Sequence, residues 1–177
     1  MARRMKQIAV ISTVLCAVFI LVNRLGNSSV WLSLAITFAT ISYHFIMRLV
    51  VGYLYDRVMQ NKADYNRAWY QIHPFEKRLY QWIKVKKWKK NMPTYSPELF
   101  DYEEHTWSEI AQAMCQAELV HETIVILSFL PVLMSKWWDA FGVFLVTSIA
   151  AALFDLCFVF MQRYNRPRIV KLTERRG

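Results

Sequence analysis

Four long apolar segments are the feature that most constrains how this chain can fold. They cover approximately residues 7–24, 30–53, 119–136 and 139–161. A helix of roughly 20 apolar residues crosses the hydrocarbon core of a bilayer, which is about 30 Å thick. Because helices satisfy their own backbone polar groups in lipid, the segments predict an all-α integral membrane protein with four transmembrane helices. Residues 1–177 are expected to form a single membrane domain.

The first apolar segment also fits a second interpretation. Its uncharged part, Ile8–Val22, is short for a membrane span and follows a basic start, as the apolar region of a signal peptide does. No small-residue cleavage site of the A-x-A kind follows it, which favours a retained transmembrane helix.

Positive charge is distributed unevenly along the chain. The sequence combines a formal charge of +9 with 55% hydrophobic residues, a combination that argues against nucleic acid as a partner. Lys and Arg concentrate at the N-terminus, in the connection 54–118 and in the basic tail 162–177, whereas the two other connections, Asn23 to Ser29 and Ser135 to Asp139, hold one basic residue each. The positive-inside rule therefore predicts a multi-pass protein of the cell membrane with the connection and both termini in the cytoplasm.

The sequence lacks the common motifs for metal, disulfide and phosphate-loop chemistry. The three cysteines lie far apart, mostly in apolar stretches, which supports neither a disulfide framework nor a zinc site. A nucleophile elbow, a Gly-rich phosphate loop and a dinucleotide fingerprint are also missing. We therefore expect no metal site and no bound cofactor, and phosphate recognition would depend on Lys and Arg.

The stretch Ile72–Lys90 in the central connection has an amphipathic pattern. Lysines surround an approximately helical face formed by Phe75, Leu79, Trp82, Val85 and Trp88. This pattern is typical of a helix in the lipid headgroup region, so an interfacial cytoplasmic helix is predicted. Most of its lysines are expected to be solvated or to meet anionic lipid, and the alternative is that some bind a phosphorylated donor.

The helix of the third apolar segment is predicted to begin well before the segment itself. Thr106 and Glu109 have the spacing of a capping box, which marks the start of a helix. Helix-compatible sequence continues from there into the apolar segment. Pro131 should kink this helix near the far membrane surface.

The helix of the third segment carries a histidine between two carboxylates. Glu118 precedes His121 by three residues, so it is expected to bond the imidazole and fix its tautomer, as a general base requires. Two alternatives stay open: the carboxylates of Glu118 and Glu122 are interfacial charges, or His121 is a hydrogen-bonded group packed between helices. No second Glu-x-x-His is present to complete a di-iron site.

A polar stripe follows one face of the second segment. Its members are Ser33, Thr37, Thr40, His44 and Arg48. In lipid such a stripe must face protein or water, so His44 and Arg48 are candidates for lining a substrate site. The alternative for Arg48 is a structural salt bridge with Asp155 of the fourth segment.

A run of arginines, QRYNRPR at residues 162–168, directly follows the fourth segment. The positive-inside rule alone would explain its charge. Tyr164 and Asn165 inside the run, with Pro167 where the helix should stop, indicate instead a shaped site.

Three motifs in order resemble one known family. They are VKKWK at 85–89, AELVH at 117–121 followed by Pro131, and QRYNRPR at 162–168. Over roughly residues 72–172 the chain resembles the small integral-membrane glycosyl-diaponeurosporenoate acyltransferases of staphyloxanthin-type carotenoid synthesis. The resemblance implies transfer of a fatty acyl group from acyl-coenzyme A or an acyl carrier protein to a hydroxyl of a membrane glycolipid, either a glycosylated carotenoid or another.

The resemblance also assigns roles to residues. The family motifs point to Lys86, Lys87, Trp88, Glu118, His121, Arg163, Tyr164, Asn165, Arg166 and Arg168. In this assignment His121 is the general base oriented by Glu118, and the arginines with the two lysines bind donor phosphates. The chain departs from the family pattern at Asp155 and Cys157, where an Asn and a Pro are expected, and at Glu122, where an aromatic is expected. These departures concern the acceptor more than the chemistry.

Two other functions remain open from the sequence. One is a small membrane methyltransferase that acts on a lipid or prenyl group, and the other is a lipid-binding membrane protein without enzymatic activity. In the second, the basic run only sets topology, and membrane lipids are the partners. A homo-oligomer is compatible with every one of these functions.

Overall fold

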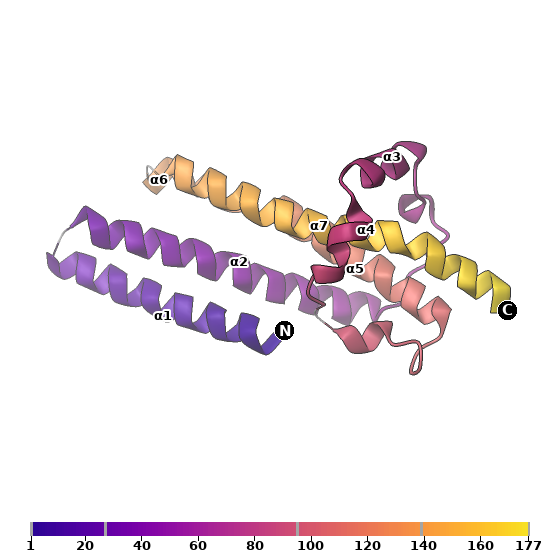
Figure 1. The fold of residues 1–177 in the computed structure, drawn as a ribbon. Helices are drawn as coiled ribbons and strands as arrows, with labels where there is room; N and C mark the ends of the chain where they lie inside the picture. Colours follow the sequence, from indigo (N-terminus) through magenta and orange to yellow (C-terminus); the bar gives the residue numbers. More distant parts are fainter. Residues whose placement is uncertain (1, 27, 95, 139, 177) are drawn as a thin grey trace. The chain divides into compact units, whose positions relative to one another are not determined.

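Helices form all of the regular structure in the part of the chain that is described, residues 2–26, 28–94, 96–138 and 140–176 of a computed structural model (Figure 1). The α-helices are α1 Ala2–Gly26, α2 Ser29–Met59, α3 Pro74–Trp82, α4 Val85–Trp88, α5 Trp107–Leu127, α6 Leu130–Trp138 and α7 Phe141–Arg176. Short 3₁₀ turns occupy Ala68–Tyr70, Lys89–Asn91 and Pro97–Phe100. The predicted all-α class is confirmed. The predicted start of the fourth span, Asp139, lies outside the described residues, as does the last residue of the basic tail.

Within the part of the chain that the structure describes, four helical stretches are long and apolar enough to cross a membrane. They are Arg3–Gly26, Ser29–Met59, Trp107–Trp137 and Phe141–Arg175. Their number and order confirm the four predicted spans and indicate a multi-pass membrane protein. Each stretch is longer than the apolar segment that predicts it, because polar and charged residues at the ends continue the helix.

The chain divides into two compact units whose boundaries fall within long helices. The first unit takes the residues up to Gly52 and Ile124–Leu153. The second unit takes Tyr53–Thr123 and the residues from Phe154 onward. The helices α2, α5 and α7 therefore each contribute one part to either unit.

In the first unit, α1 and α2 run side by side (Figure 1). The hydroxyl groups of Thr13 and Ser42 form a hydrogen bond of 2.5 Å between the two helices. Tyr43 donates from its hydroxyl to the carbonyl oxygen of Leu127 at 2.8 Å. Hydrogen bonds between helices are favoured in lipid, where water does not compete for polar groups.

The polar stripe of α2 changes from exposed to buried along the helix. Ser33 and Thr37 are exposed, and each hydroxyl donates to the carbonyl oxygen four residues earlier. Thr40 and His44 are buried, and the half-buried Arg48 donates to the carbonyl oxygen of His44 at 2.9 Å. The stripe therefore turns toward protein only in its second half.

The predicted amphipathic helix over Ile72–Lys90 is wrong as a single helix. In the second unit this stretch forms α3 and α4, and Lys84 between them has a left-handed backbone with φ of 54°. A left-handed residue breaks a right-handed helix because its backbone leaves the helical conformation. Whether α3 and α4 lie in the headgroup region stays a prediction.

The start and the interruption of the third helical stretch agree with their sequence signals. The backbone N–H of Thr106 donates to Oε2 of Glu109 at 2.8 Å, and the N–H of Glu109 donates to the Thr106 hydroxyl at 3.3 Å. This is the predicted capping box, and α5 begins directly after it. The helix is interrupted at Ser128 and Phe129, between α5 and α6, just before Pro131.

The predicted end of the last helix at Pro167 is also wrong. Pro167 lies inside α7, which continues to Arg176. A proline within a helix removes one backbone hydrogen bond and disfavours the turn before it, but neighbouring contacts can offset that cost. The basic run 162–168 is therefore helical, and its side chains project at helical spacing.

Candidate active site

A histidine of α5 pairs with an aspartate of α7 in the second unit. Nδ1 of His121 lies 2.9 Å from Oδ1 of Asp155, whose side chain is 1% exposed. The imidazole stacks on Phe158, with ring centroids 4.4 Å apart. When Asp155 accepts the Nδ1–H, the lone pair resides on Nε2. Nε2 has no hydrogen-bond partner among the described residues, so in this tautomer it is able to accept a proton.

The carboxylate that orients His121 is not the predicted one. Both oxygens of Glu118 accept hydrogen bonds from arginines: Oε1 from Arg163 at 2.5 Å, and Oε2 from Arg166. Glu118 is fully buried, and two guanidinium groups compete for it more strongly than a neutral imidazole does. The expected contact between Glu118 and His121 is therefore replaced by the contact with Asp155.

Arg163 directs all of its guanidinium donors to protein acceptors. Its Nε and one terminal nitrogen each lie 2.7 Å from an oxygen of Glu76, a bidentate pair. The remaining hydrogen bonds go to Glu118, to the carbonyl oxygen of Trp69 at 2.9 Å and to that of Gln71 at 3.0 Å. A guanidinium has five N–H groups, so all of the donors of Arg163 are engaged.

Arg166 completes the same buried network. Its side chain is 2% exposed and donates to Glu118 and to the carbonyl oxygen of Tyr70. The guanidinium also lies 5.0 Å from the centroid of the Tyr70 ring, a cation–π contact. Three successive carbonyl oxygens, those of residues 69–71, therefore accept hydrogen bonds from the two arginines of α7.

Glu76 connects α3 to this network. Its carboxylate also accepts a hydrogen bond of 2.6 Å from the hydroxyl of Tyr80. Burial alone would raise the pKa of Glu76, but hydrogen bonds from Arg163, from Tyr80 and from the backbone of His73 lower it to about 2. Burial and the neighbouring Glu76 charge raise the pKa of Tyr80. Glu76 is thus ionised and Tyr80 neutral near pH 7.

A second group of cations lies around Lys89, which contacts the ring of Tyr164. We call it the basic cluster, and it comprises Lys86, Lys89, Lys90 and Arg168. Nζ of Lys89 lies 4.9 Å from the Tyr164 centroid and donates to Asn165, while Arg168 lies 4.7 Å from the same centroid and donates to the Tyr164 hydroxyl at 2.9 Å. Burial lowers the pKa of Lys89, and the other three cations lower it further. Cations that repel one another in this way favour the binding of an anion.

Comparison with protein families gives a match over residues 66–175, which contain His121, Asp155, the arginine network and the basic cluster. The description of the matching family is glycosyl-4,4'-diaponeurosporenoate acyltransferase. The chain belongs to this family. The family is named for acyl transfer, so membership indicates acyltransferase activity. Neither the curated proteins nor the solved structures yield a match.

The residues that the acyltransferase resemblance singles out fall into three places in the structure. Glu118, Arg163 and Arg166 form the buried network, and His121 lies on the same helix as Glu118. Tyr164, Asn165, Arg168 and the exposed Lys86 lie at the basic cluster. Lys87 is also exposed, and Trp88 donates from Nε1 to the carbonyl oxygen of Ile83 at 3.0 Å. His44 and Arg48 belong to the first unit, so their role at the site stays a prediction.

Two positions at which the chain departs from the acyltransferase pattern belong to the second unit. Asp155 bonds His121, and Glu122 accepts a hydrogen bond of 3.1 Å from Nε1 of Trp69. The sequence predicted Arg48 as the bonding partner of Asp155 and named Asp155 as a departure from the family pattern, but did not connect it with His121. Because Asp155 lies about three helical turns before Arg166, it shares a face of α7 with that arginine, which was an available signal.

Glu76 and Lys89 were not predicted as site residues. Glu76 follows Pro74 in the first turn of α3, where an acidic residue is commonly a helix-capping group. Lys89 is one of several lysines in 84–90, and only its contacts with Tyr164 and Asn165 distinguish it. A single sequence contains no pattern that indicates contacts between residues far apart along it.

Proposed function

We propose that this protein transfers a fatty acyl group from an activated thioester to a sugar hydroxyl of a membrane glycolipid, with His121 as the general base. The pairing of His121 with Asp155 is the observation that carries this proposal, because it leaves Nε2 able to accept a proton. The name of the family supports acyl transfer and suggests the acceptor class, a glycosylated carotenoid acid.

The proposed reaction is a direct transfer. Nε2 of His121 accepts the proton of the acceptor hydroxyl while the hydroxyl oxygen attacks the thioester carbonyl carbon. The tetrahedral intermediate collapses, the C–S bond breaks, and the imidazolium returns the proton to the departing thiolate. An ester and a free thiol are the products. Asp155 stabilises the imidazolium by its charge and holds the ring in one orientation.

We further propose that the basic cluster binds the phosphate groups of the donor. The donor is acyl-coenzyme A or the phosphopantetheine arm of an acyl carrier protein, and both carry phosphate. Mutual repulsion within the cluster and the lowered pKa of Lys89 support an anionic ligand there. Tyr164 and Asn165 position Lys89 and Arg168, and the exposed Lys87 lies next in sequence to the cluster.

Arg163 and Arg166 have a different role in this proposal. Their donors are engaged by Glu76, Glu118 and the carbonyl oxygens of residues 69–71, so they act as positioning residues. They hold α3 and the preceding turn against α7 in the second unit. This replaces the predicted binding of donor phosphates by these two side chains.

The proposed topology has both termini and the connection 54–118 in the cytoplasm. The distribution of Lys and Arg supports it, because positive charge accumulates on the cytoplasmic side of membrane proteins. Both proposed donors are cytoplasmic, so the basic cluster would face the compartment that supplies them.

Acyl transfer can be tested with the purified protein in lipid nanodiscs. A labelled acyl-coenzyme A and a glycosylated carotenoid acid should yield a lipid heavier by one acyl group. His121→Ala should lower kcat by about 10²- to 10⁴-fold, the usual contribution of a general base. His105→Ala is the matched control, because His105 is half-buried in the same unit and its side chain contacts Glu109, outside the candidate site. Full activity of folded His121→Ala, or transfer of a methyl label without acyl transfer, would contradict the proposal.

A further inference from the structure

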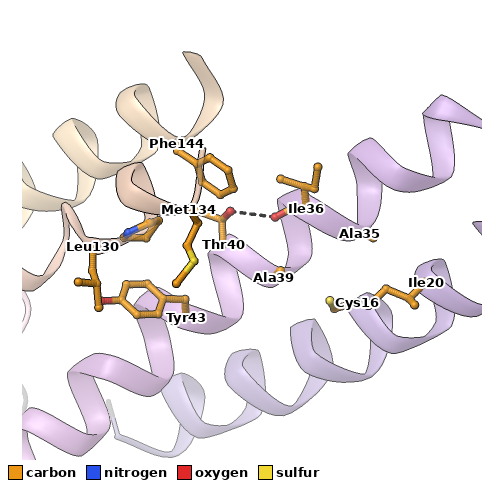
Figure 2. Close-up of a pocket in the computed structure, with 11 residues that line it drawn as sticks. Cys16, Ile20, Ala35, Ile36, Ala39, Thr40, Tyr43, Leu130, Met134 and Phe144 are labelled. Carbon is orange, nitrogen blue, oxygen red and sulfur yellow. Dashed lines mark hydrogen bonds between the residues drawn. The ribbon is translucent and has the colours of Figure 1, made fainter. Parts of the chain in front are cut away.

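Helix α3 exposes two large aromatic side chains although it is not one of the spanning stretches. Phe75 is 65% exposed and Trp82 is 78% exposed. On the spanning stretches, the surrounding lipid accounts for exposed apolar side chains. It also accounts for the apolar wall of a pocket in the first unit, whose lining residues all lie on those stretches (Figure 2). The aromatic side chains of α3 need a different explanation.

The side chains of α3 divide into three sectors around the helix. One sector is apolar, one is buried against protein, and one is polar and exposed. In that order, their members are Phe75, Leu79 and Trp82; Glu76 and Tyr80; and Lys77 and Gln81. Because successive residues of a helix are about 100° apart, the centres of the sectors are separated by at least about 100°. A helix with this division can contact lipid, protein and water at the same time.

The buried sector packs on α7 where the apolar segment of that helix ends. The ring centroid of Tyr80 lies 5.7 Å from that of Phe160 and 6.1 Å from that of Tyr164. Phe160 belongs to the apolar segment of the fourth span, and Tyr164 belongs to the basic run that follows it. A span leaves the hydrocarbon where its sequence changes from apolar to basic. The packing therefore attaches α3 at the level of the membrane surface.

The charge on the outside of α3 and α4 is positive. The exposed basic residues are Lys77, Arg78, Lys84, Lys86 and Lys87. Glu76, the one acidic residue from Pro74 to Trp88, is buried and bound to Arg163, so its charge is already compensated. Exposed aromatic side chains among basic residues are typical of a helix in the headgroup region, where cations also attract anionic lipid.

The exposed surface is smaller than the amphipathic face that the sequence pattern predicts. Val85 of that face is fully buried, and Trp88 is half-buried. The left-handed backbone at Lys84 interrupts the helix before both of them. The aromatic surface is therefore confined to α3, and we call its apolar sector the aromatic face.

We propose that the aromatic face of α3 docks on anionic phospholipid at the surface of the bilayer that the spans cross. The contact of Tyr80 with Phe160 places the bilayer next to this face, so a phospholipid surface is the occupant that the packing favours. The exposed Arg78 flanks the aromatic face and supplies a charge for an anionic headgroup. The docked helix is then held by lipid on one side and by α7 on another.

Photocrosslinking identifies what covers the aromatic face. p-Benzoylphenylalanine replaces Trp82 in the full-length protein, which is placed in nanodiscs of equal parts phosphatidylglycerol and phosphatidylcholine, and adducts are identified by mass spectrometry after irradiation. We expect a phospholipid adduct at position 82. If this variant does not fold, Phe75 is replaced in the same way. No phospholipid adduct from the aromatic face of a folded variant would overturn the proposal.

The same replacement at Tyr102 is the matched control. Tyr102 is 66% exposed in the same unit, but it lies between Asp101 and Glu103. Because anionic lipid repels these carboxylates, the adduct yield at position 102 should be lower by about tenfold. Comparable yields at the two positions would overturn the proposal, since the crosslinks would then report only proximity to a nanodisc.

The lipid composition of the adducts tests the role of charge. One basic residue near an anionic surface contributes about 1 kcal/mol, so phosphatidylglycerol should exceed phosphatidylcholine about fivefold at position 82. Arg78→Gln should reduce this preference, whereas Lys62→Gln, at an exposed lysine outside α3, should leave it unchanged. Equal amounts of the two lipids would overturn the proposal.

Addition of an acidic acyl carrier protein tests the competing occupant. A crosslink to the carrier protein that replaces the phospholipid adduct would overturn the proposal and assign the aromatic face to protein docking. An unchanged phospholipid adduct would support it. None of these measurements requires acyl transfer, so their outcome is independent of the proposed function.

Discussion

Nδ1 of His121 and Oδ1 of Asp155 are 2.9 Å apart although the two residues belong to different helices. Each residue lies within a long helix, so its backbone is fixed by regular hydrogen bonds on both sides. Stacking on Phe158 fixes the plane of the imidazole as well. The pair is thus held by a hydrogen bond and a ring stack between two regular helices, so its geometry does not depend on a flexible loop.

Replacing Asp155 should impair the chemical step. In Asp155→Asn the amide can donate to Nδ1, which places the remaining ring proton on Nε2 and removes the base. We expect kcat to fall by about 10²-fold or more with little change in KM, and Asp155→Glu to recover part of the loss. Steady-state kinetics in nanodiscs measure both. Wild-type kcat in Asp155→Asn would show that another group orients His121.

Replacing Glu118 should mainly affect stability. Glu118→Gln leaves Arg163 and Arg166 buried without one of their two counter-charges, a change that costs about 3–5 kcal/mol in buried ion pairs. The free energy of unfolding can be compared between variants in the same detergent. Glu98→Gln is the control because Glu98 is exposed. If the two variants were equally stable, the buried network would not hold the second unit together.

The contribution of Glu76 should depend on pH. The pKa of Glu76 is lowered from 4.5 to about 2 in the folded protein, so the stability it adds is present above about pH 4.5 and is lost as the pH falls toward 2. At pH 7 the contribution is about 3 kcal/mol. Glu76→Gln should therefore be less stable than wild type at pH 7, and the difference should decrease below pH 4.5. A constant difference from pH 7 to pH 3 would contradict this assignment.

Changes in the basic cluster should weaken donor binding. Arg168→Gln removes one charged donor, and we expect KM for acyl-coenzyme A to rise roughly ten- to hundredfold while kcat changes little. Arg168→Lys keeps the charge but loses the fork geometry, so its KM should be intermediate. Lys62→Gln, at an exposed lysine outside the cluster, is the control. An equal rise in KM for Arg168→Gln and Lys62→Gln would indicate only general attraction of the donor.

The left-handed residue between α3 and α4 offers a test of the local fold. Lys84 has φ of 54°, a conformation that costs most residues about 1 kcal/mol and glycine almost nothing. Lys84→Gly should be as stable as wild type or slightly more stable, whereas Lys84→Val should be less stable by more than 1 kcal/mol. Thermal unfolding of the purified variants provides the measurement. The opposite order would show that this stretch is one continuous helix.

The features of the fold that could be predicted from the sequence are local ones. Apolar length predicts the four spans, and the spacing of Thr106 and Glu109 predicts the start of α5. The helix break at Lys84 could not be predicted, because lysine has no preference for a left-handed backbone. The helix end predicted at Pro167 was wrong because contacts of α7 with the rest of the second unit offset the loss of the backbone hydrogen bond that proline removes.

Several residues of the candidate site could be predicted from the sequence, but which of them contact one another could not. Spacing along α5 places Glu118 and His121 within reach of each other, and that alone favoured a contact between them. The arginines of α7 changed this outcome because a guanidinium binds a carboxylate in two places at once. The relative rotation of two helices decides which of their charged groups meet. This rotation cannot be read from the pattern of a single sequence.

The turn at residues 69–71 is anchored to α7 through main-chain oxygens, which every amino acid possesses. The identity of the side chains at Trp69 and Gln71 is therefore not needed for this attachment, whereas Tyr70 also supplies a ring to Arg166. A saturation-mutagenesis map should consequently be uneven: selective for aromatics at Tyr70, intolerant at both arginines, and more permissive at Trp69 and Gln71, whose side chains bond only Glu122 and the carbonyl oxygen of Tyr65 among the described residues. The sequence requirement for this attachment therefore falls almost entirely on the two arginines of α7 and hardly at all on the turn that they bind.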